Sequence, residues 1–450
     1  MKESHADIVI VGGGLSGCAL AAGLADGRRH VVVVEARAGR NPRFNGELIH
    51  PTGVDVLDAR GFLAPLVDAG GALVTGFACV PEPGEPTTLL PYREIPSSRP
   101  HGFAIDHRDL VDVLRKQLPN IELRTGERVT NLLRADERVI GVETSAGRIR
   151  APLTLACDGR HSKVRTLLGI DERARLLSFT AAALLEDCEL PHAGFGHIFL
   201  GAWGPILAYP ISQRDARTCI DLPADMDRGK DAVIARIREG YAPKLPAPVR
   251  VSLERSLAAG EVEIAANYAI YTDECTVPGA ALVGDAGGCS HPLTATGMTI
   301  ALNDTRLLSR ALAGCDLGRP RDVDAALTRY QTERYRYVRA REILADALYE
   351  VFRGGDDGSR AIRKGIFRYW QSSARSRARS MALLSGAESR LPAFLREYLT
   401  VVGMSTEAVL RGAVNEPTLA GRWRSLVGLG RKSFEKLGIV ARSVADGSLR

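Results

Sequence analysis

The stretch DIVIVGGGLSGCALAAGLA, residues 7–25, decides the fold of the first part of this 450-residue chain. Residues 7–11 are short, apolar and β-branched and are followed by glycine, which predicts a buried parallel strand. Residues 15–25 are rich in Ala and Leu and predict a helix, and VVVVE at 31–35 predicts a second buried strand. The stretch therefore opens a βαβ unit.

Three glycines, Gly12, Gly14 and Gly17, stand between the predicted strand and helix with the spacing GxGxxG. Glycine at these positions lets the backbone turn tightly and approach a pyrophosphate, which then faces the N-terminus of the helix. Glu35 lies 18 residues beyond Gly17, where a carboxylate can accept hydrogen bonds from ribose hydroxyls. Together these features predict a site for a dinucleotide with an adenosine half.

Two further loops carry acidic residues directly after predicted strands. Asp158 and Gly159 follow the strand predicted at 153–157, and Asp285 follows a second apolar run. Asp285 can meet a ribityl hydroxyl there, and Gly297 opens a helix whose N–H groups could stabilise charge on an isoalloxazine ring. Taken singly, each loop is also compatible with an ordinary strand-to-helix turn.

The remaining sequence changes character along its length. An amphipathic helix is predicted at 106–118, and short strands alternating with turns at 176–270, with one helix near 228–239, predict a mostly antiparallel sheet. A long helical pattern covers 322–352 and ends at a glycine-rich break. Three domains are predicted: a discontinuous nucleotide-binding domain at 1–75, 100–175 and 275–320, an inserted sheet domain at 76–99 and 176–274, and a helical region at 321–450.

Composition argues against several classes of protein. Hydrophobic residues make up 45% and charged residues 25% of the chain, which is typical of soluble globular domains and not of disordered, collagen-like or polytopic membrane proteins. The eight cysteines are scattered without a CxxC pair, so we expect small buried side chains in a reducing compartment and no metal centre. The N-terminus lacks the basic region of a signal peptide, which predicts a cytoplasmic location.

The C-terminal part is basic, because residues 360–450 hold 17 Lys and Arg against six Asp and Glu. Basic amphipathic helices can lie on anionic bilayers, which predicts peripheral membrane contact. The alternative is that these helices cover the sheet domain or form a dimer face. Nucleic-acid binding is not expected, since no binding module is recognisable. The apolar residues among the charges are Ile366, Phe367, Tyr369, Trp370, Met381, Leu383 and Leu384.

In their order and spacing, the three motifs resemble those of the single-component FAD-dependent monooxygenases built like the aromatic hydroxylases. The resemblance covers about residues 5–340. It implies an α/β fold of the para-hydroxybenzoate hydroxylase type, with a Rossmann-like FAD-binding domain, an inserted antiparallel sheet domain for substrate and a helical C-terminal region. In that family the first motif holds the ADP half of FAD, the second serves FAD and the reduced nicotinamide, and the third holds the ribityl and flavin half.

Two segments resemble squalene epoxidases more closely. RFNGELIHP at 43–51 is similar to their RIVGELLQP-type segment, and GDAGGCSHPLTATGMTIAL at 284–302 is similar to their GDAxxxxHPLTGGGMTVA segment without a gap. The resemblance implies that the guanidinium groups of Arg43 and Arg108 pair with the pyrophosphate, the alternative being surface salt bridges. The motifs and the resemblance together assign to FAD Gly12, Gly14, Leu15, Ser16, Gly17, Glu35, Ala36, Arg43, Arg108, Val129, Asp158, Gly159, Asp285, Pro292, Gly297 and Met298.

The sequence departs from these epoxidases at two places. Their three glycines are Ala295, Thr296 and Gly297 here, which makes the peptide beside the flavin less free. His50 stands where they carry Gln, and we predict it as a catalytic residue that hydrogen-bonds a flavin or substrate oxygen. The alternative is a structural histidine before Pro51.

The resemblance implies a monooxygenase reaction. NAD(P)H, directly or through a partner reductase, would reduce FAD, and O2 would form a C4a-hydroperoxide that delivers one oxygen atom to a hydrophobic polyketide, terpenoid or aromatic substrate. An isolated alkene would give an epoxide, and a phenol a hydroxylated product. Two alternatives stay open: a flavin-dependent double-bond reductase of the geranylgeranyl-reductase type, and a non-catalytic carrier of lipophilic partners like the Rab escort-type proteins.

Overall fold

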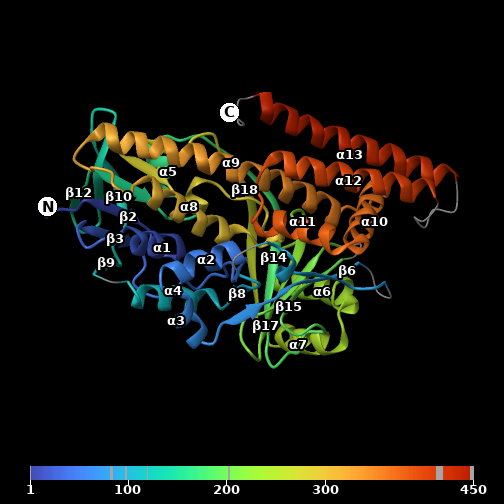
Figure 1. The fold of residues 1–450 in the computed structure, drawn as a ribbon. Helices are drawn as coiled ribbons and strands as arrows, with labels where there is room; N and C mark the ends of the chain where they lie inside the picture. The colour runs from blue at the N-terminus through green and yellow to red at the C-terminus, as the bar shows by residue number, and fades with distance from the viewer. Residues whose placement is uncertain are drawn as a thin grey trace.

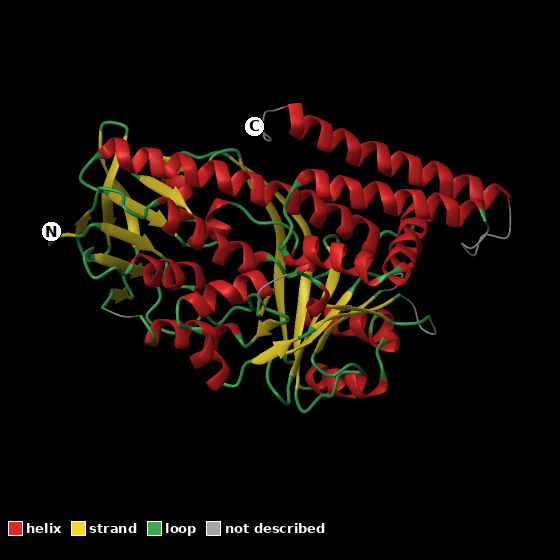
Figure 2. Ribbon diagram, in the orientation of Figure 1, coloured by secondary structure: helices red, strands yellow, loops and turns green. Residues whose placement is uncertain are grey.

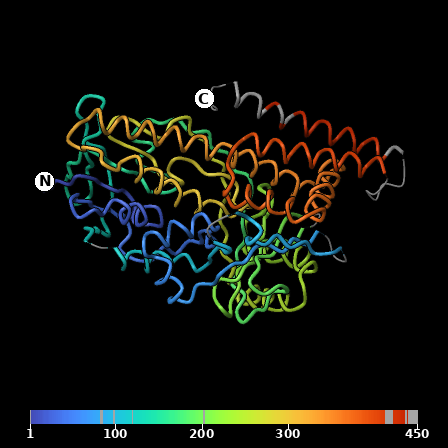
Figure 3. Tube along the Cα trace, viewed as in Figure 1, coloured from blue at the N-terminus to red at the C-terminus, as the bar shows by residue number. Residues whose placement is uncertain are grey.

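The computed structural model gathers the N-terminal elements at one end, a large sheet beneath the other end and the C-terminal helices above that sheet (Figures 1 and 2). The trace in Figure 3 shows that the yellow segment near residue 300 returns to lie beside the blue N-terminal segment. The two segments meet through the packing of α1 (Leu15–Leu24) against α8 (Gly297–Ala311). The structure describes residues 2–81, 85–96, 99–118, 120–200, 203–411 and 419–445.

The predicted βαβ unit forms the centre of a six-stranded sheet. β2 (Ile8–Val11) pairs in parallel with β3 (Val31–Glu35) on one side and with β13 (Leu153–Ala156) on the other, and β20 (Ala280–Leu282) pairs in parallel with β13. Because the carboxyl ends of parallel strands meet at one edge of a sheet, the three motifs that follow β2, β13 and β20 come together there. The outer strands are β9 (Glu122–Thr125), beside β3, and β19 (Thr276–Val277), antiparallel to β20.

Two smaller sheets complete this part of the molecule. One contains the β10–β11 hairpin, and the other lies where the segment around residue 48 meets the segment around residue 103. The first has the order β1 (Glu3–His5), β12 (Arg148–Arg150), β11 (Arg138–Thr144), β10 (Val129–Ala135), and the second has the order β4 (Leu48–Ile49), β8 (Gly102–Ala104), β5 (Ala72–Val74).

A seven-stranded, mostly antiparallel sheet forms the other end of the molecule, as the strand pattern predicts. Strands from two separate stretches of the chain share it, because β15 pairs in parallel with β6. The order is β18 (Val262–Thr272), β14 (Glu172–Leu185), β17 (Ala216–Pro223), β16 (Ile206–Pro210), β15 (Phe195–Phe199), β6 (Gly76–Val80) and β7 (Thr88–Pro91).

The predicted helices lie near their expected positions, and the structure adds short helices that were not predicted, one of them in the sheet domain. The sheet domain holds α6 (Lys230–Gly240), which is predicted, and also α7 (Ala247–Ala258), which is not. The sequence APVRVSL in α7 has two β-branched valines and a proline, but Pro248 lies in the first turn, where a missing N–H costs nothing. The other helices are α2 (Pro51–Ala59), α3 (Leu63–Asp68), α4 (His107–Lys116), α5 (Lys163–Leu168), α9 (Pro320–Arg353), α10 (Asp357–Ser372), α11 (Ala374–Ser385), α12 (Leu391–Leu410) and α13 (Leu419–Ala445).

The apolar side chains of α10 and α11 do not face solvent. Phe367, Trp370 and Met381 are buried in one hydrophobic core with Leu90 and Tyr209 of the large sheet. Of the seven residues that the sequence offers for membrane contact, six are buried and Leu384 is partly buried against the same core. The prediction that these particular residues contact a membrane is therefore wrong, and the alternative that they cover the sheet domain is correct.

The outermost helices, α12 and α13, instead carry the exposed apolar side chains of this region. Within the described residues, no helix combines the length and the apolar character needed to cross a bilayer.

Candidate active site

The loop between β2 and α1 packs tightly against the loop after β13. Gly12 has a φ of +104°, and a Cβ there would lie 2.4 Å from the carbonyl oxygen of Cys157. A Cβ on Gly17 would lie 1.8 Å from the carbonyl oxygen of Gly12. By contrast, a Cβ on Gly14 would meet no protein atom within 4 Å, because Gly14 borders open space. The predicted glycines thus form a close-packed loop whose exposed backbone can approach a ligand.

A cavity of about 100 Å³ lies beyond Gly14, on the side of β3. Glu35 lines it and accepts hydrogen bonds from the backbone N–H groups of Gly13 and Arg37, both at 2.8 Å. Arg115 of α4 holds this corner together, since it donates to the carbonyl of Gly13 at 2.8 Å and lies 3.3 Å from the Glu35 carboxylate. The geometry suits the ribose of an adenosine half. The sequence did not single out Arg115, although it shares a helix with Arg108.

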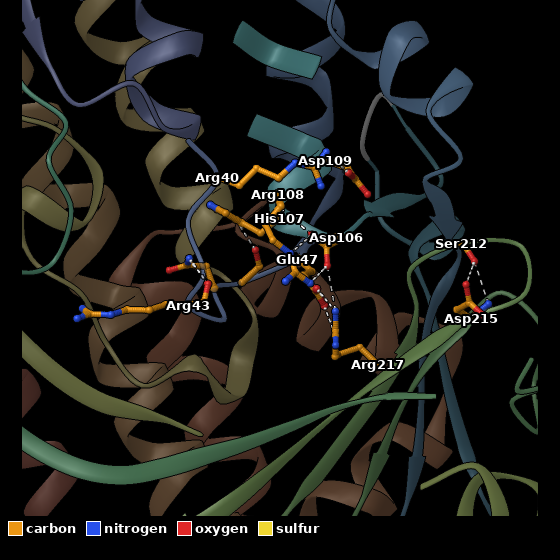
Figure 4. Close-up of polar contacts among 12 residues, drawn as sticks. Arg40, Arg43, Glu47, Asp106, His107, Arg108, Asp109, Ser212, Asp215 and Arg217 are labelled. Atoms are coloured by element: carbon orange, nitrogen blue, oxygen red, sulfur yellow. Dashed lines mark hydrogen bonds and ion pairs between the residues drawn. The ribbon is translucent and has the colours of Figure 1, made fainter. Parts of the chain in front are cut away.

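The two arginines expected at the pyrophosphate differ in placement. Arg108 lines the smaller cavity, but its guanidinium donates to Asp106 at 2.7 and 3.0 Å. Burial alone would raise the pKa of Asp106, but the hydrogen bonds from Arg108 lower it to about 2. Arg43 is exposed and lines neither cavity, and Figure 4 shows its side chain directed away from Glu47. The structure does not bring Arg43 to the site.

A larger cavity of about 320 Å³ continues from Gly14 and His107, which line both cavities. It runs between the three motif loops and the inner face of the seven-stranded sheet. Most of the residues assigned to FAD line one cavity or both, so the structure brings them together. Those that line the larger cavity are Gly14, Leu15, Ser16, Gly159, Asp285, Pro292, Gly297 and Met298.

Asp285 offers a carboxylate to this cavity. Burial raises its pKa, and its side chain accepts no hydrogen bond from any residue that the structure describes. Its neighbour in the motif is fixed separately, because buried Asp304 accepts from the Gly284 N–H at 2.9 Å and from Arg334 at 2.8 Å. A deep carboxylate without a protein donor suits a hydroxyl-bearing ligand such as a ribityl chain.

Asp158 supports the site without lining it. Its carboxylate accepts from the hydroxyl of Ser162 at 2.6 Å and from the N–H of Val164 at 3.1 Å, so it fixes the start of α5. Buried Arg165 then ties two motif loops together by donating to the carbonyls of Arg160 and Ala286, both at 2.7 Å. This differs from the predicted FAD contact, since the role is to shape the loop that Gly159 exposes.

Val129 and Ala36 also lie outside the cavities. Val129 is buried in the core beside β11, and Ala36 is exposed immediately after Glu35. Neither lines a cavity, so the structure does not bring them to the site.

His50 does not reach the cavity, contrary to the predicted contact with a flavin or substrate oxygen. It is fully buried, its Nδ1 lies 2.6 Å from the Tyr92 hydroxyl and its Nε2 lies 2.8 Å from the carbonyl oxygen of Thr294. A carbonyl only accepts, so Nε2 carries the proton and Nδ1 accepts from Tyr92. Both ring nitrogens are thus occupied within the protein, and the structural alternative holds: His50 anchors the segment that lines the cavity.

The pH dependence of stability should report this buried imidazole. Burial lowers the pKa of His50 to about 4. Between pH 6.5 and 4 the unfolded chain binds a proton that the folded protein does not, so stability falls by up to about 3 kcal/mol as pH drops through this range. We expect His50→Gln to remove this component, giving a flatter plot of unfolding free energy against pH in urea titrations. Parallel curves for the two proteins would contradict the assignment.

Ala295 adopts a left-handed conformation beside the cavity, with a φ of +51°. Residues with a Cβ seldom adopt this region, and the epoxidases that the sequence resembles carry glycine here. The left-handed φ of Ala295 agrees with the expectation that the peptide at this position is less free than in a glycine-rich segment.

A buried ionic cluster joins the nucleotide-binding part to the large sheet (Figure 4). Arg217 of β17 donates to both carboxylate oxygens of Glu47, at 2.7 and 3.0 Å, and lies 3.2 Å from Asp106. The Tyr209 hydroxyl also donates to Glu47, at 3.1 Å. Glu47 is 2% and Arg217 4% exposed. The sequence missed this cluster, and its only signal was Glu47 within the segment similar to squalene epoxidases.

Polar side chains also gather where the large sheet faces the cavity. The Ser178 hydroxyl donates to Asp221 Oδ1 at 2.5 Å, and His291 Nε2 lies 2.8 Å from Ser178 and 3.2 Å from Asp221. Asp221 Oδ2 has no hydrogen-bond partner within the described part of the chain. Asn267 donates to Ser178 at 2.8 Å. The wall opposite the motif loops therefore combines this polar cluster with apolar side chains such as Leu207.

The residues present fit FAD. An elongated pair of connected cavities begins at a ribose-binding carboxylate, passes the open backbone at Gly14 and reaches the unpartnered carboxylate of Asp285. FAD supplies, when bound, the redox chemistry that activates O2. These groups of the chain would bind FAD, and the fixed loops would orient it. The large sheet would form one wall of the cavity.

Comparison with protein families and curated proteins agrees with this geometry. The family model of squalene epoxidase matches residues 150–420. The chain is 32% identical to squalene epoxidase 2, mitochondrial, of Arabidopsis thaliana over 441 residues, which cover 94% of this chain and 73% of that protein. It is 31% identical to the squalene epoxidase erg1 of Aspergillus fumigatus over 388 residues, covering 82% and 80%.

Solved structures confirm the predicted fold class. The p-nitrophenol 4-monooxygenase PnpA of Pseudomonas putida matches with a TM-score of 0.72 and 20% identity, over 86% of this chain and 100% of that one. PqsL of P. aeruginosa, in complex with 2-aminobenzoylacetate, matches with a TM-score of 0.67 and 23% identity, over 78% and 97%.

Proposed function

This chain belongs to the squalene epoxidase family, and from that premise we propose that it epoxidises an isolated double bond of a hydrophobic, acyclic terpenoid. It is an FAD-dependent monooxygenase that inserts one oxygen atom into a hydrophobic substrate, as predicted. Membership of this family favours the monooxygenase over the double-bond reductase and the carrier. The observation that carries the finer proposal is the cavity itself, whose apolar wall faces the segment 292–298 that also lines the FAD site.

The reaction that we propose consumes one O2, one NAD(P)H and one proton for each alkene. One oxygen atom bridges the two alkene carbons, and the other leaves as water with two electrons from NAD(P)H. No side chain has to deprotonate an alkene, so the residues of this chain need only bind, orient and exclude water. Leu207, Leu293 and Ile300 provide apolar surface for such a substrate.

The test is to incubate the FAD-loaded protein with ¹⁸O2, NADH or NADPH, and three candidate substrates: squalene, an acyclic terpenoid alcohol and a phenol. Each is assayed with and without an added NAD(P)H-dependent flavoprotein reductase. We expect an epoxide carrying one ¹⁸O from a terpenoid. Hydroxylation of the phenol alone, or a saturated product without ¹⁸O, would overturn the proposal. Dependence on the added reductase would identify a partner reductase as the route from NAD(P)H.

We also propose that α13 makes the peripheral membrane contact. Trp423, Val427 and Phe434 are 69%, 54% and 81% exposed, and their spacing puts them on one face of the helix. Exposed Arg424, which lies 3.2 Å from Asp357, and exposed Arg431 are on one side of this stripe and can meet anionic headgroups. Large exposed apolar side chains next to basic ones are typical of helices that lie in a membrane interface.

Vesicle sedimentation tests this contact. Replacing both Trp423 and Phe434 by alanine is expected to weaken binding to vesicles containing anionic lipid by about tenfold or more, because two large apolar side chains no longer leave water. Val251→Ala is the matched control, since Val251 is 61% exposed on α7, at the opposite end of the view in Figure 1. Equal binding of the double variant and the control would contradict the proposal.

A further inference from the structure

A second large cavity, of about 690 Å³, lies away from the candidate active site. It opens between α2, α8 and α9 and is closed by the turn at 386–389 that follows α11. It shares no lining residue with the two cavities assigned to FAD and substrate. Nothing in the proposed epoxidation requires this cavity.

The walls of this cavity are strongly basic. Arg60, Arg306 and Arg310 line it, and none of the three forms an ion pair with a carboxylate within the described residues. Burial lowers the pKa of Arg60, which reflects the cost of keeping its charge away from water. Among the described residues that line the cavity, the one carboxylate is Asp55, which already lies 3.4 Å from the guanidinium of Arg99. The cavity therefore carries an excess of positive charge.

Several polar atoms at the cavity are buried without a partner. Arg60 Nε and Ser309 Oγ have no hydrogen-bond partner within the part of the chain that the structure describes. Because leaving a buried donor unsatisfied costs about 1–3 kcal/mol, and more for a charged group, such donors favour a bound acceptor. Arg60 directly follows α2 and Ser309 lies in α8, so the two residues reach the cavity from different elements.

A buried arginine beneath the wall adds to the unbalanced charge. Arg341 is 3% exposed, and its Nε and Nη1 have no hydrogen-bond partner in the described ranges. Its guanidinium packs 4.1 Å from the ring centroid of Tyr337 and against Gly386, both of which line the cavity. The carboxylate that acts on it electrostatically, Asp304, is already engaged by Arg334. An anion in the cavity would offset the desolvation of this buried cation.

We propose that this cavity is a binding site for an anionic phosphate ligand, with a diphosphate group as the best match. Guanidinium groups bind phosphate oxygens in pairs, and three arginines with the hydroxyl of Ser309 supply more donors than one carboxylate could use. The volume leaves room for an organic group attached to the phosphates. Such a ligand would touch residues 52–60, 303–313 and 386–389 at once and would tie the C-terminal region to the nucleotide-binding part.

The test uses the FAD-loaded protein, in which the cofactor already fills the other phosphate site, and inorganic pyrophosphate as the probe. Isothermal titration should show saturable binding of one pyrophosphate per chain and a raised melting temperature. Arg60→Gln and Arg306→Gln should each weaken binding by about tenfold or more, since each removes a charged donor. Arg321→Gln is the control, because Arg321 is an exposed arginine of α9 outside the cavity.

The flavin content and melting temperature of each variant without pyrophosphate establish that it is folded. Absence of saturable binding to the unaltered protein, or equal weakening by Arg321→Gln, would overturn the proposal. Competition then identifies the source of the phosphate: displacement by ADP indicates a free organic diphosphate, and displacement by vesicles of phosphatidic acid indicates a lipid headgroup. Because no readout involves turnover, a failure here is distinguishable from a failure of the proposed epoxidation.

Discussion

A Gly17→Ala variant is expected to purify with little or no flavin. The added Cβ would lie 1.8 Å from the carbonyl oxygen of Gly12, far inside van der Waals contact, and no side-chain rotation can move a Cβ or a backbone carbonyl oxygen. The loop between β2 and α1 must therefore shift away from the position in which it can receive a pyrophosphate. We expect FAD affinity to fall on the order of 100-fold, equivalent to about 2.8 kcal/mol. The measurement is the ratio of flavin to protein after gel filtration.

Two other glycine variants distinguish a loss of FAD binding from unfolding of the protein. Gly403→Ala, in α12, adds a Cβ that meets no atom within 4 Å, so flavin should be retained and stability should rise by about 1 kcal/mol. Gly14→Ala also meets no protein atom, but it lines both cavities, so it should fold normally and still bind FAD more weakly. Full flavin content in Gly17→Ala would show that the loop does not hold the cofactor as described.

Arg217→Ala is expected to destabilise the protein by about 3–5 kcal/mol, because it leaves the Glu47 carboxylate buried and unpaired. Arg217 makes a two-pronged contact with Glu47 and also reaches Asp106, so one substitution strips a shared cation from two carboxylates. These residues connect the large sheet to the nucleotide-binding part, so the relative placement of the two should loosen as well. Urea unfolding at neutral pH measures the loss.

An exposed ion pair provides the matched control. Arg214 lies 3.1 Å from Asp187, and the two side chains are 80% and 66% exposed. Arg214→Ala should cost no more than about 1 kcal/mol, as is usual for surface pairs. If Arg217→Ala and Arg214→Ala destabilise the protein equally, the buried cluster does not contribute as we describe. The double replacement of Glu47 by Gln and Arg217 by Met should recover part of the loss, because no unpaired charge remains.

The nucleotide-binding sheet and its motif loops could be predicted from the sequence because both depend on local patterns of apolar residues, glycine and aspartate. Short apolar runs followed by glycine or aspartate define β2, β13 and β20, and parallel pairing then places their carboxyl ends together. The same reasoning could not place His50, since its partners Tyr92 and Thr294 are far away in the sequence. Whether a histidine faces a cavity or a carbonyl depends on tertiary packing that local pattern does not contain.

The same limit applies to the C-terminal helices and to the ionic cluster. An apolar stripe on a basic helix looks alike whether it packs on a sheet, as Trp370 does, or faces solvent, as Trp423 does. Glu47 and Arg217 are 170 residues apart in the sequence. No local sequence pattern around either residue predicts that the two side chains pair. Contacts of this kind become visible only when the domains are assembled.

The order of strands in the nucleotide-binding sheet has a consequence for biosynthesis. β2 leaves the ribosome early, yet its sheet is incomplete until β20 emerges, about 270 residues later. β13 ends about 120 residues before β20 begins, so at about 5–20 residues per second the edge of β13 stays unpaired for roughly 6 to 25 seconds. During that interval the inserted sheet can already form, since its strands are all made before β20. The cofactor site is therefore completed only after the inserted sheet has been made, and a product that ends before β20 lacks the Asp285 loop.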